Sequence, residues 1–336
     1  MKTYNELFEQ LELSLNQLKS GPIPSPGNFS YRDLDKKIFL NHILKLALNE
    51  NNDLSLWIGS SDTINTQRII WESRGIKAKQ SQDGSGVTSS WIVIEAENLY
   101  TPSIFISLAT SICTKCIEQK STKRSTVCTA LEEWREMFLK NTDGLSLNEL
   151  AGLIGELITL EEIAKVHGAT ALDTWHGFEG ECHDFSRNNF AIETKTKISV
   201  GLDISINGIN QLEPPSDGKL FLRFLRLETT TNQNQVSLSS LVDSISKLGV
   251  SQGRLQENIL KAGASINQIT QSSNYFSVLE RATYEVDEGF PRITINSFKN
   301  NECPHGVSGL KYHINLSDAE NYKVSDTTYL ELIKKL

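Results

Sequence analysis

Apolar and polar positions alternate with helical spacing between Ser146 and Gly168. The apolar residues that follow this spacing are Leu147, Leu150, Leu153, Ile154, Leu157, Leu160, Ile163 and Ala164. Their spacing predicts an amphipathic helix. Ser146 and Glu149 form an S-x-x-E capping box at its start, and Gly168 predicts its end. Glu156 falls at the edge of the apolar arc, where a carboxylate is costly to bury unless it is paired or coordinates a cation.

Strand-like alternation follows between residues 181 and 198. The pattern predicts two short strands, over residues 181–186 and 190–198, joined by a turn at the Asn-Asn pair 188–189. Asn tolerates the positive φ that a tight hairpin turn demands. A two-residue turn at this place pairs Arg187 with Phe190 and so fixes the register of the whole hairpin.

This register gathers charged side chains on one face of the hairpin. Asp184 falls directly opposite Glu193, with Cβ atoms about 5 Å apart, and the period of two places Lys195 on the same face. Two like charges that face each other destabilise a sheet, and a divalent cation between them reverses the sign of that interaction. The pattern therefore predicts a metal site with Asp184 and Glu193 as oxygen ligands, Glu156 nearby and Lys195 as the adjacent cation.

The order Glu156, Asp184, Glu193-Thr194-Lys195 resembles the PD-(D/E)XK nucleases of restriction and repair. The wider context resembles a narrower group, the largely uncharacterised prokaryotic PD-(D/E)XK proteins found in phage-defence gene clusters beside ATPases and methylases. That context comprises Gly152–Leu157, Trp175–Gly177, His183–Phe185 and Ile192–Thr196. One departure is that His183 stands where the family motif has its proline.

The resemblance implies an α/β (α+β) fold with a restriction-endonuclease-like core, in which helices flank a mixed central sheet. It implies a Mg²⁺-dependent deoxyribonuclease, with Mn²⁺ able to substitute, whose metal ligands are Asp184, Glu193 and Glu156. Lys195 would be catalytic beside them, and Gln211 corresponds to a glutamine that joins the site in many relatives. DNA, ATPase or methylase subunits and a second copy of the chain are the partners that it implies.

A [DE]-x-K triplet alone carries little information, because the chain contains several. These triplets end at Lys37, Lys120, Lys195 and Lys219. Only the triplet at Lys195 lies in an alternating strand behind another acid and a capped helix. The alternative for Glu193 and Lys195 is a surface ion pair on a half-buried strand, which leaves Glu156 and Asp184 unexplained.

The rest of the chain predicts two domains, an N-terminal α+β domain over residues 1–143 and the nuclease-like domain over 144–336. In the first domain we expect helices at 2–19, 32–49 and 102–118, with strands between the last two. We expect this domain to dock a partner or to contact DNA. In the second domain, 219–228 has the continuous apolar run of a central strand, and short strands are expected at 284–286 and 292–297.

The composition of the chain narrows the classes of function that the protein can have. The net charge of −8 argues against a protein that coats nucleic acid by bulk electrostatics, so the cleft must be locally basic or a partner must supply DNA affinity. The basic residues around the motif are Lys165, Arg187, Lys195, Lys197, Arg223 and Arg226. The odd number of cysteines, five, and the lack of a long apolar run favour a cytoplasmic protein without a membrane span. The alternative function is a catalytically inactive DNA-binding or assembly subunit of a defence complex.

Overall fold

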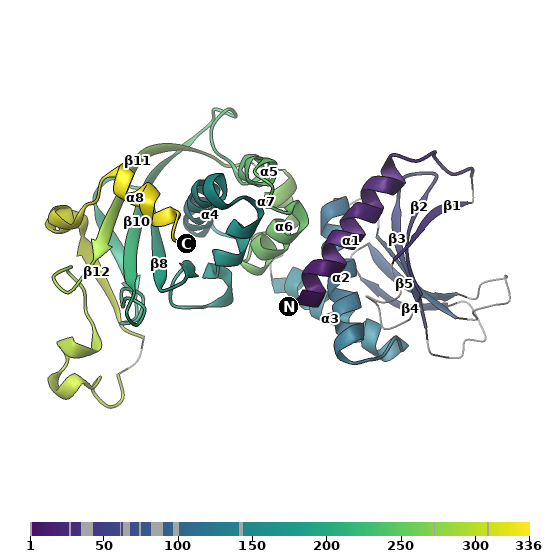
Figure 1. The fold of residues 1–336 in the computed structure, drawn as a ribbon, viewed down its shortest axis with the longest axis horizontal. Coiled ribbons are helices and arrows are strands. Elements are labelled where there is room, and N and C mark those ends of the chain that lie inside the picture. Colours follow the sequence, from purple (N-terminus) through teal and green to yellow (C-terminus); the bar gives the residue numbers. More distant parts are fainter. Residues whose placement is uncertain are drawn as a thin grey trace. The chain divides into compact units, whose positions relative to one another are not determined.

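The structure, a computed structural model, divides into two compact units, Met1–Lys140 and Asn141–Leu336 (Figure 1). It describes residues 2–26, 28–34, 43–60, 62, 68–73, 75–81, 90–96, 101–140, 144–271, 273–307 and 309–336. The division lies close to the predicted domain boundary between residues 143 and 144, and residues 141–143 lie outside the described residues.

The first unit is an antiparallel sheet in the order β1-β2-β3-β6-β5-β4, with α1 and α2 on one face (Figure 1). Its elements are α1 (Lys2–Lys19), β1 (Phe29–Asp33), β2 (Leu44–Asn49), β3 (Leu54–Gly59), β4 (Arg68–Ser73), β5 (Ile76–Ser81), β6 (Trp91–Ala96), α2 (Pro102–Glu118) and α3 (Arg124–Lys140). Alternating residues of neighbouring strands, such as Leu46, Leu56 and Ile94, are paired in register and fully buried, so one face of the sheet forms the core of the unit.

The helix predicted over residues 32–49 is wrong wherever the structure describes that stretch. Its ends lie in β1 and β2, which pair with each other, and residues 35–42 lie outside the described residues. The apolar positions Leu44, Leu46 and Leu48 also fit the strand period of two, and pairing on both sides with β1 and β3 decides in favour of the strand.

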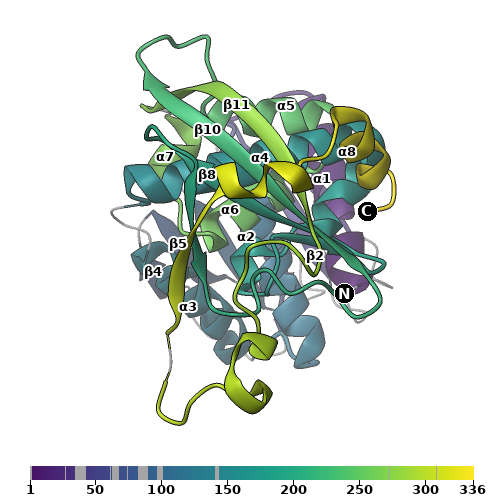
Figure 2. The same cartoon turned by 90° about the vertical axis from the view of Figure 1, so that its left-hand side faces the viewer.

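The second unit is built on a mixed sheet in the order β11-β10-β8-β7. β8 and β10 run parallel, and the other pairs are antiparallel. Figure 1 shows α4 and α5 on one side of this sheet and β12 on the other, and Figure 2 shows β10 and β11 as two long neighbouring strands. A mixed sheet with helices against it confirms the predicted fold class, an α/β (α+β) restriction-endonuclease-like core.

The elements of the second unit follow in chain order. The α-helices are α4 (Leu147–His167), α5 (Leu238–Lys247), α6 (Gln252–Lys261), α7 (Ile266–Thr270) and α8 (Asp326–Ile333). The strands are β7 (Phe185–Arg187), β8 (Phe190–Lys197), β9 (Asp203–Asn207), β10 (Lys219–Thr230), β11 (Tyr275–Val286) and β12 (Lys311–Asn315). The 3-10 helices are η1 (Gly168–Thr174), η2 (Gly177–Glu179), η3 (Ile295–Ser297), η4 (Lys299–Asn301) and η5 (Leu316–Tyr322).

Two expectations for this unit need correction. The strand predicted at 292–297 is absent from these described residues, which contain the 3-10 helix η3 instead. The strand expected at 284–286 is the end of the much longer β11, whose charged residues Glu280 and Arg281 hide the alternation. β11 also contains a register shift opposite Arg226 and Leu227, and such a bulge breaks a strict period of two.

Helix α4 begins and ends as its sequence predicts. The capping box between Ser146 and Glu149 is formed, and Gly168 follows the last turn at a φ of 57°. Against the sheet, α4 is held by a buried ion pair, because Arg223 of β10 donates to both carboxylate oxygens of Glu162 at 2.8 and 3.0 Å. Tyr329 of α8 donates to the same carboxylate at 2.8 Å, so three elements meet there.

A glycine allows α4 to lie close against β8. A Cβ built on Gly155 would lie 1.8 Å from the hydroxyl oxygen of Thr196, whereas one on Gly152 meets nothing within 4 Å. We therefore expect Gly155→Ala to destabilise the protein by about 1–3 kcal/mol through overpacking. Gly152→Ala in the same helix is the matched control and should be neutral or stabilising by up to about 1 kcal/mol. Chemical denaturation of both variants measures this, and equal stabilities would contradict the close packing.

Candidate functional site

The predicted hairpin is present, with its turn at the predicted place. Asn188 and Asn189 have φ angles of 49° and 63°, the left-handed conformation that a tight hairpin turn demands. Arg187 pairs with Phe190, which confirms the predicted register. The first strand is shorter than predicted, because the ladder ends at Phe185, and the segment before it turns away to form η2.

Glu193 and Lys195 of β8 lie on the same face of the sheet and contact each other. Glu193 is 1% exposed, and the ammonium of Lys195 donates to its carboxylate at 2.7 Å. Asp184 stands one residue before the ladder, where the continued register places it across from Glu193. Its carboxylate accepts the backbone N–H of Thr194 at 2.7 Å. The hairpin therefore brings Asp184, Glu193 and Lys195 to the same end of the sheet.

Glu156 reaches this group from α4. The indole N–H of Trp175 donates to its Oε2 at 2.8 Å. A Cβ built on Gly177 would lie 2.6 Å from that same oxygen and 2.9 Å from Oδ1 of Asp184. One glycine backbone thus lies against both carboxylates, which places Glu156 next to Asp184.

Burial raises the pKa of each of the three acids, and repulsion by neighbouring acids adds to this for Glu156 and Glu193. Burial, followed by the charge of Asp184, raises the pKa of Glu193 to about 8, although the ammonium of Lys195 opposes this shift. Burial also raises the pKa of Asp184 to about 6. Burial and then the charge of Asp184 hold the pKa of Glu156 well above its usual value, while the Trp175 hydrogen bond lowers it. The raised pKa values mean that the charged forms of these carboxyls are unfavourable here, and a bound cation would stabilise those charged forms.

The residues present fit a divalent cation that prefers oxygen ligands. Carboxylates are the protein ligands that Mg²⁺ uses most, and Mg²⁺ keeps several of its waters. The backbone of Gly177 lies against both Glu156 and Asp184, and it carries no side chain that would collide with these carboxylates. Glu193 and Asp184 are at the same time held by Lys195 and by the Thr194 amide. We therefore regard this group as a candidate cation site.

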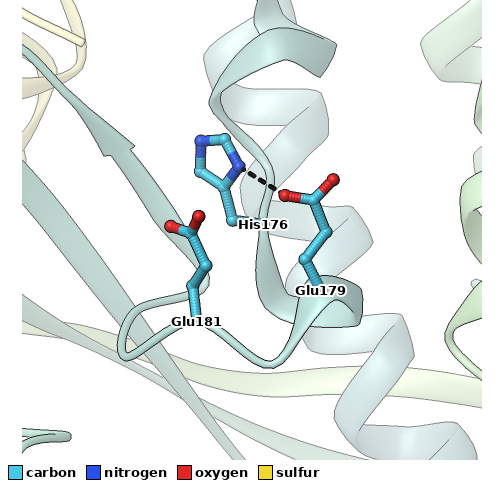
Figure 3. Close-up of side chains that lie close together, drawn as sticks. All are labelled: His176, Glu179 and Glu181. Carbon is cyan, nitrogen blue, oxygen red and sulfur yellow. Dashed lines mark hydrogen bonds and ion pairs between the residues drawn. The ribbon is translucent and has the colours of Figure 1, made fainter.

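A second group with metal-ligand chemistry lies in the segment before β7. Ligand atoms of His176, Glu179 and Glu181 all lie within 4.8 Å of one another, and this is the one such set of three found among the described residues. Figure 3 shows their side chains facing one another. His176 and Glu179 are joined at 3.2 Å. The sequence prediction missed this group because its three residues follow no strand or helix period. Both glutamates are exposed, and exposed acidic groups are common without an ion.

Gln211 does not take part in the contacts that join Glu156, Asp184, Glu193 and Lys195. Its side-chain oxygen accepts the backbone N–H of Asn207 at 2.9 Å and so holds the turn after β9. This contact gives Gln211 a structural role as a loop amide, which is the alternative to a place in the site. A catalytic role for Gln211 stays a prediction.

Most of the basic residues around the motif form ion pairs with acidic residues. Lys165 pairs with Glu161, Lys197 with Asp203 and Arg226 with Glu280, in each case within 3.2 Å. Arg223 is 3% exposed and is bound to Glu162. Each of these four cations is therefore paired with an acid, and Arg223 is buried inside the unit.

A mixed sheet that carries two acids and a lysine on one hairpin, with a third acid from the preceding helix, defines a PD-(D/E)XK-like protein. The family model described as "Putative PD-(D/E)XK family member, (DUF4420)" matches residues 4–317. The chain therefore belongs to this family. No curated protein and no solved structure matches it. In the part of the chain that the structure describes, no helix is long and apolar enough to cross a membrane.

Proposed function

We propose that the protein is a Mg²⁺-dependent endonuclease that hydrolyses DNA phosphodiester bonds and acts in restriction or another defence against phage. The observation that carries this proposal is the convergence of Glu156, Asp184, Glu193 and Lys195 from α4 and one hairpin. Family membership supports the same conclusion, because PD-(D/E)XK proteins are nucleases in general. Defence is the context that the resemblance implies.

Asp184 and Glu193 would hold Mg²⁺, with Glu156 as a third acid beside them, and Mn²⁺ would substitute. When bound, the cation would lower the pKa of a water molecule and neutralise charge on the scissile phosphate. The raised pKa values of these carboxyls support this assignment, since groups with strongly perturbed pKa values in contact with one another gather at functional sites.

Lys195 has a separate task. Its ammonium is fixed by Glu193 at 2.7 Å, so it needs little reorganisation when charge develops beside it. From there it orients the attacking water and donates to the phosphate oxygen on which negative charge accumulates. The water oxygen forms the new bond to phosphorus, and the bond from phosphorus to the leaving sugar oxygen breaks.

Incubation with plasmid, linear and single-stranded DNA tests the activity. We expect cleavage with Mg²⁺ or Mn²⁺ and none with a chelator, and we expect Glu193→Ala to lose activity under all conditions. Gel electrophoresis of the products also separates endonuclease action, which linearises the plasmid, from action at ends. If wild type and Glu193→Ala cut at equal rates, this site is not the catalytic one.

The second candidate function is an inactive DNA-binding or assembly subunit. The ion-paired state of Lys165, Lys197 and Arg226 favours it, because neighbouring acids balance the charges that would attract phosphates. A partner subunit, such as the ATPase or methylase that the resemblance implies, would then supply DNA affinity. A chain that takes up no cation and cuts no DNA would support this function over the first.

Calorimetric titration with Mg²⁺ and Mn²⁺ separates the two candidates. We expect one site in the wild type and none in Asp184→Asn, with Asp203→Asn as the control on an exposed acid. The pKa of Asp184 is raised to about 6 and that of Glu193 to about 8. Protons therefore compete with the cation, and affinity should rise as pH increases from about 6 to 8. Equal affinities at these pH values would contradict ligation by these carboxylates.

A further inference from the structure

The segment Trp175–Gly177 lies against the candidate site, although none of its residues is one of the four motif residues Glu156, Asp184, Glu193 and Lys195. Trp175 forms an isolated bridge with Phe185, and the backbone N–H of His176 donates to the carbonyl of Asp184 at 2.7 Å. The segment thus extends the pairing at the start of β7. Through these backbone contacts it is fixed next to the aspartate.

Trp175 touches the one acid of the site that comes from a helix. Its ring is 1% exposed, and its Nε1–H donates to Oε2 of Glu156 at 2.8 Å. Glu156 lies on α4 and so does not share the hairpin that holds Asp184 and Glu193. A donor on one oxygen fixes the orientation of a carboxylate and directs its other oxygen elsewhere.

Gly177 allows the chain to pass close to both carboxylates, because it has no side chain. Any side chain at this position would place its Cβ 2.6 Å from Oε2 of Glu156 and 2.9 Å from Oδ1 of Asp184. Real Cβ atoms do not approach other atoms that closely. Glycine is therefore required if the two carboxylates are to keep their present positions.

We propose that Trp175 is a positioning residue, which orients Glu156 toward the cation, and that Gly177 keeps the space between Glu156 and Asp184 in which the cation or its water lies. This inference rests on the proposed cation site. Its competitor is a packing role, because Trp175 also stacks edge-on against Phe178 with ring centroids 5.1 Å apart. A packing role would change stability without acting through Glu156.

Cation affinity in a double-mutant cycle separates these roles. Trp175→Phe keeps an aromatic ring and removes the N–H donor. We expect it to weaken Mg²⁺ binding by about tenfold or more in calorimetry, as loss of a hydrogen bond to a ligand does. In a Glu156→Ala background the same change should have little effect, because the acceptor of the Trp175 N–H is gone. Equal effects in both backgrounds, or none in the first, would overturn the proposal.

Gly177→Ala tests the second part. We expect it to weaken Mg²⁺ binding by at least as much as Trp175→Phe, whereas Gly152→Ala, which meets open space, should bind as the wild type does. Wild-type affinity in Gly177→Ala would overturn the spatial role of this residue.

The unsubstituted protein provides a measurement that does not depend on the folding of any variant. Trp175 is the only tryptophan among residues 141–336, and the other four lie at 57, 71, 91 and 134. With ¹⁵N-labelled tryptophan, its indole N–H signal is assigned by single Trp→Phe changes at the other positions. We expect this signal to shift on Mg²⁺ addition with the calorimetric affinity, while the others serve as references. An unmoved Trp175 signal in a protein that binds Mg²⁺ contradicts this inference alone, and absence of all Mg²⁺ binding contradicts the proposed function first.

Discussion

Lys195→Ala is expected to reduce DNA cleavage by about a hundredfold to a thousandfold, the range observed when one preorganised donor to a developing charge is removed. The physical reason is that the Lys195 ammonium, 2.7 Å from Glu193, is the cation that contacts the acids of the site. Among the described residues, no other cation makes such a contact. Cleavage rates under single-turnover conditions with saturating Mg²⁺ measure the loss directly.

Lys219→Ala provides the matched control. Lys219 lies on the neighbouring strand β10, pairs with Glu285 at the surface, and has a side chain that is 58% exposed. An exposed pair of this kind contributes little to stability, so this variant should cut at the wild-type rate. Circular dichroism should show that both variants are folded. If Lys195→Ala retains the wild-type rate, Lys195 has no part in the chemistry.

Glu193→Gln is expected to make the cation-free protein more stable at alkaline pH. The folded-state pKa of Glu193 is about 8, above its usual value of 4.5. A carboxyl raised in this way contributes stability that is fully present below about pH 4.5 and is lost as pH rises through about 8. In chelator, the wild type should therefore lose stability between these values, and Glu193→Gln should recover on the order of a few kcal/mol at pH 9.

Thermal unfolding at pH 5, 7 and 9 measures this effect. Glu285→Gln, at an exposed acid of β11, is the control and should follow the wild type. With Mg²⁺ present, the order should reverse, because the cation stabilises only the protein that retains Glu193. A wild-type stability that does not fall between pH 5 and 9 would mean that the buried carboxyls do not oppose folding. Such a result would also remove the main electrostatic argument for a cation.

Local signals predicted the parts of the site that depend on neighbouring residues in sequence. The capping box of Ser146 and Glu149 and the turn at Asn188-Asn189 are both present, and the turn sets the register that brings Asp184 toward Glu193. These features are decided within a few residues, where propensity and turn chemistry dominate.

Features that depend on distant contacts were not predictable. Gly177 lies against Glu156, and Arg223 binds Glu162 across a separation of 61 residues, although no local pattern joins either pair. The wrong helix at residues 32–49 has the same cause, because pairing of β2 with both of its neighbours overrides a spacing that fits either period.

The ion pair beneath α4 has a consequence for fragments of this protein. The family match ends at residue 317, yet Tyr329 beyond that point donates to Glu162 and lies under the guanidinium of Arg223, 4.1 Å from ring centroid to carbon. A fragment that ends at residue 317 would lack Tyr329. The ion pair between Glu162 and Arg223 would then be exposed to solvent on the side that the tyrosine ring covers. Glu162 lies on the same helix as Glu156. Such a fragment would therefore hold α4 less firmly against the sheet and weaken the support of Glu156, although every motif residue would still be present.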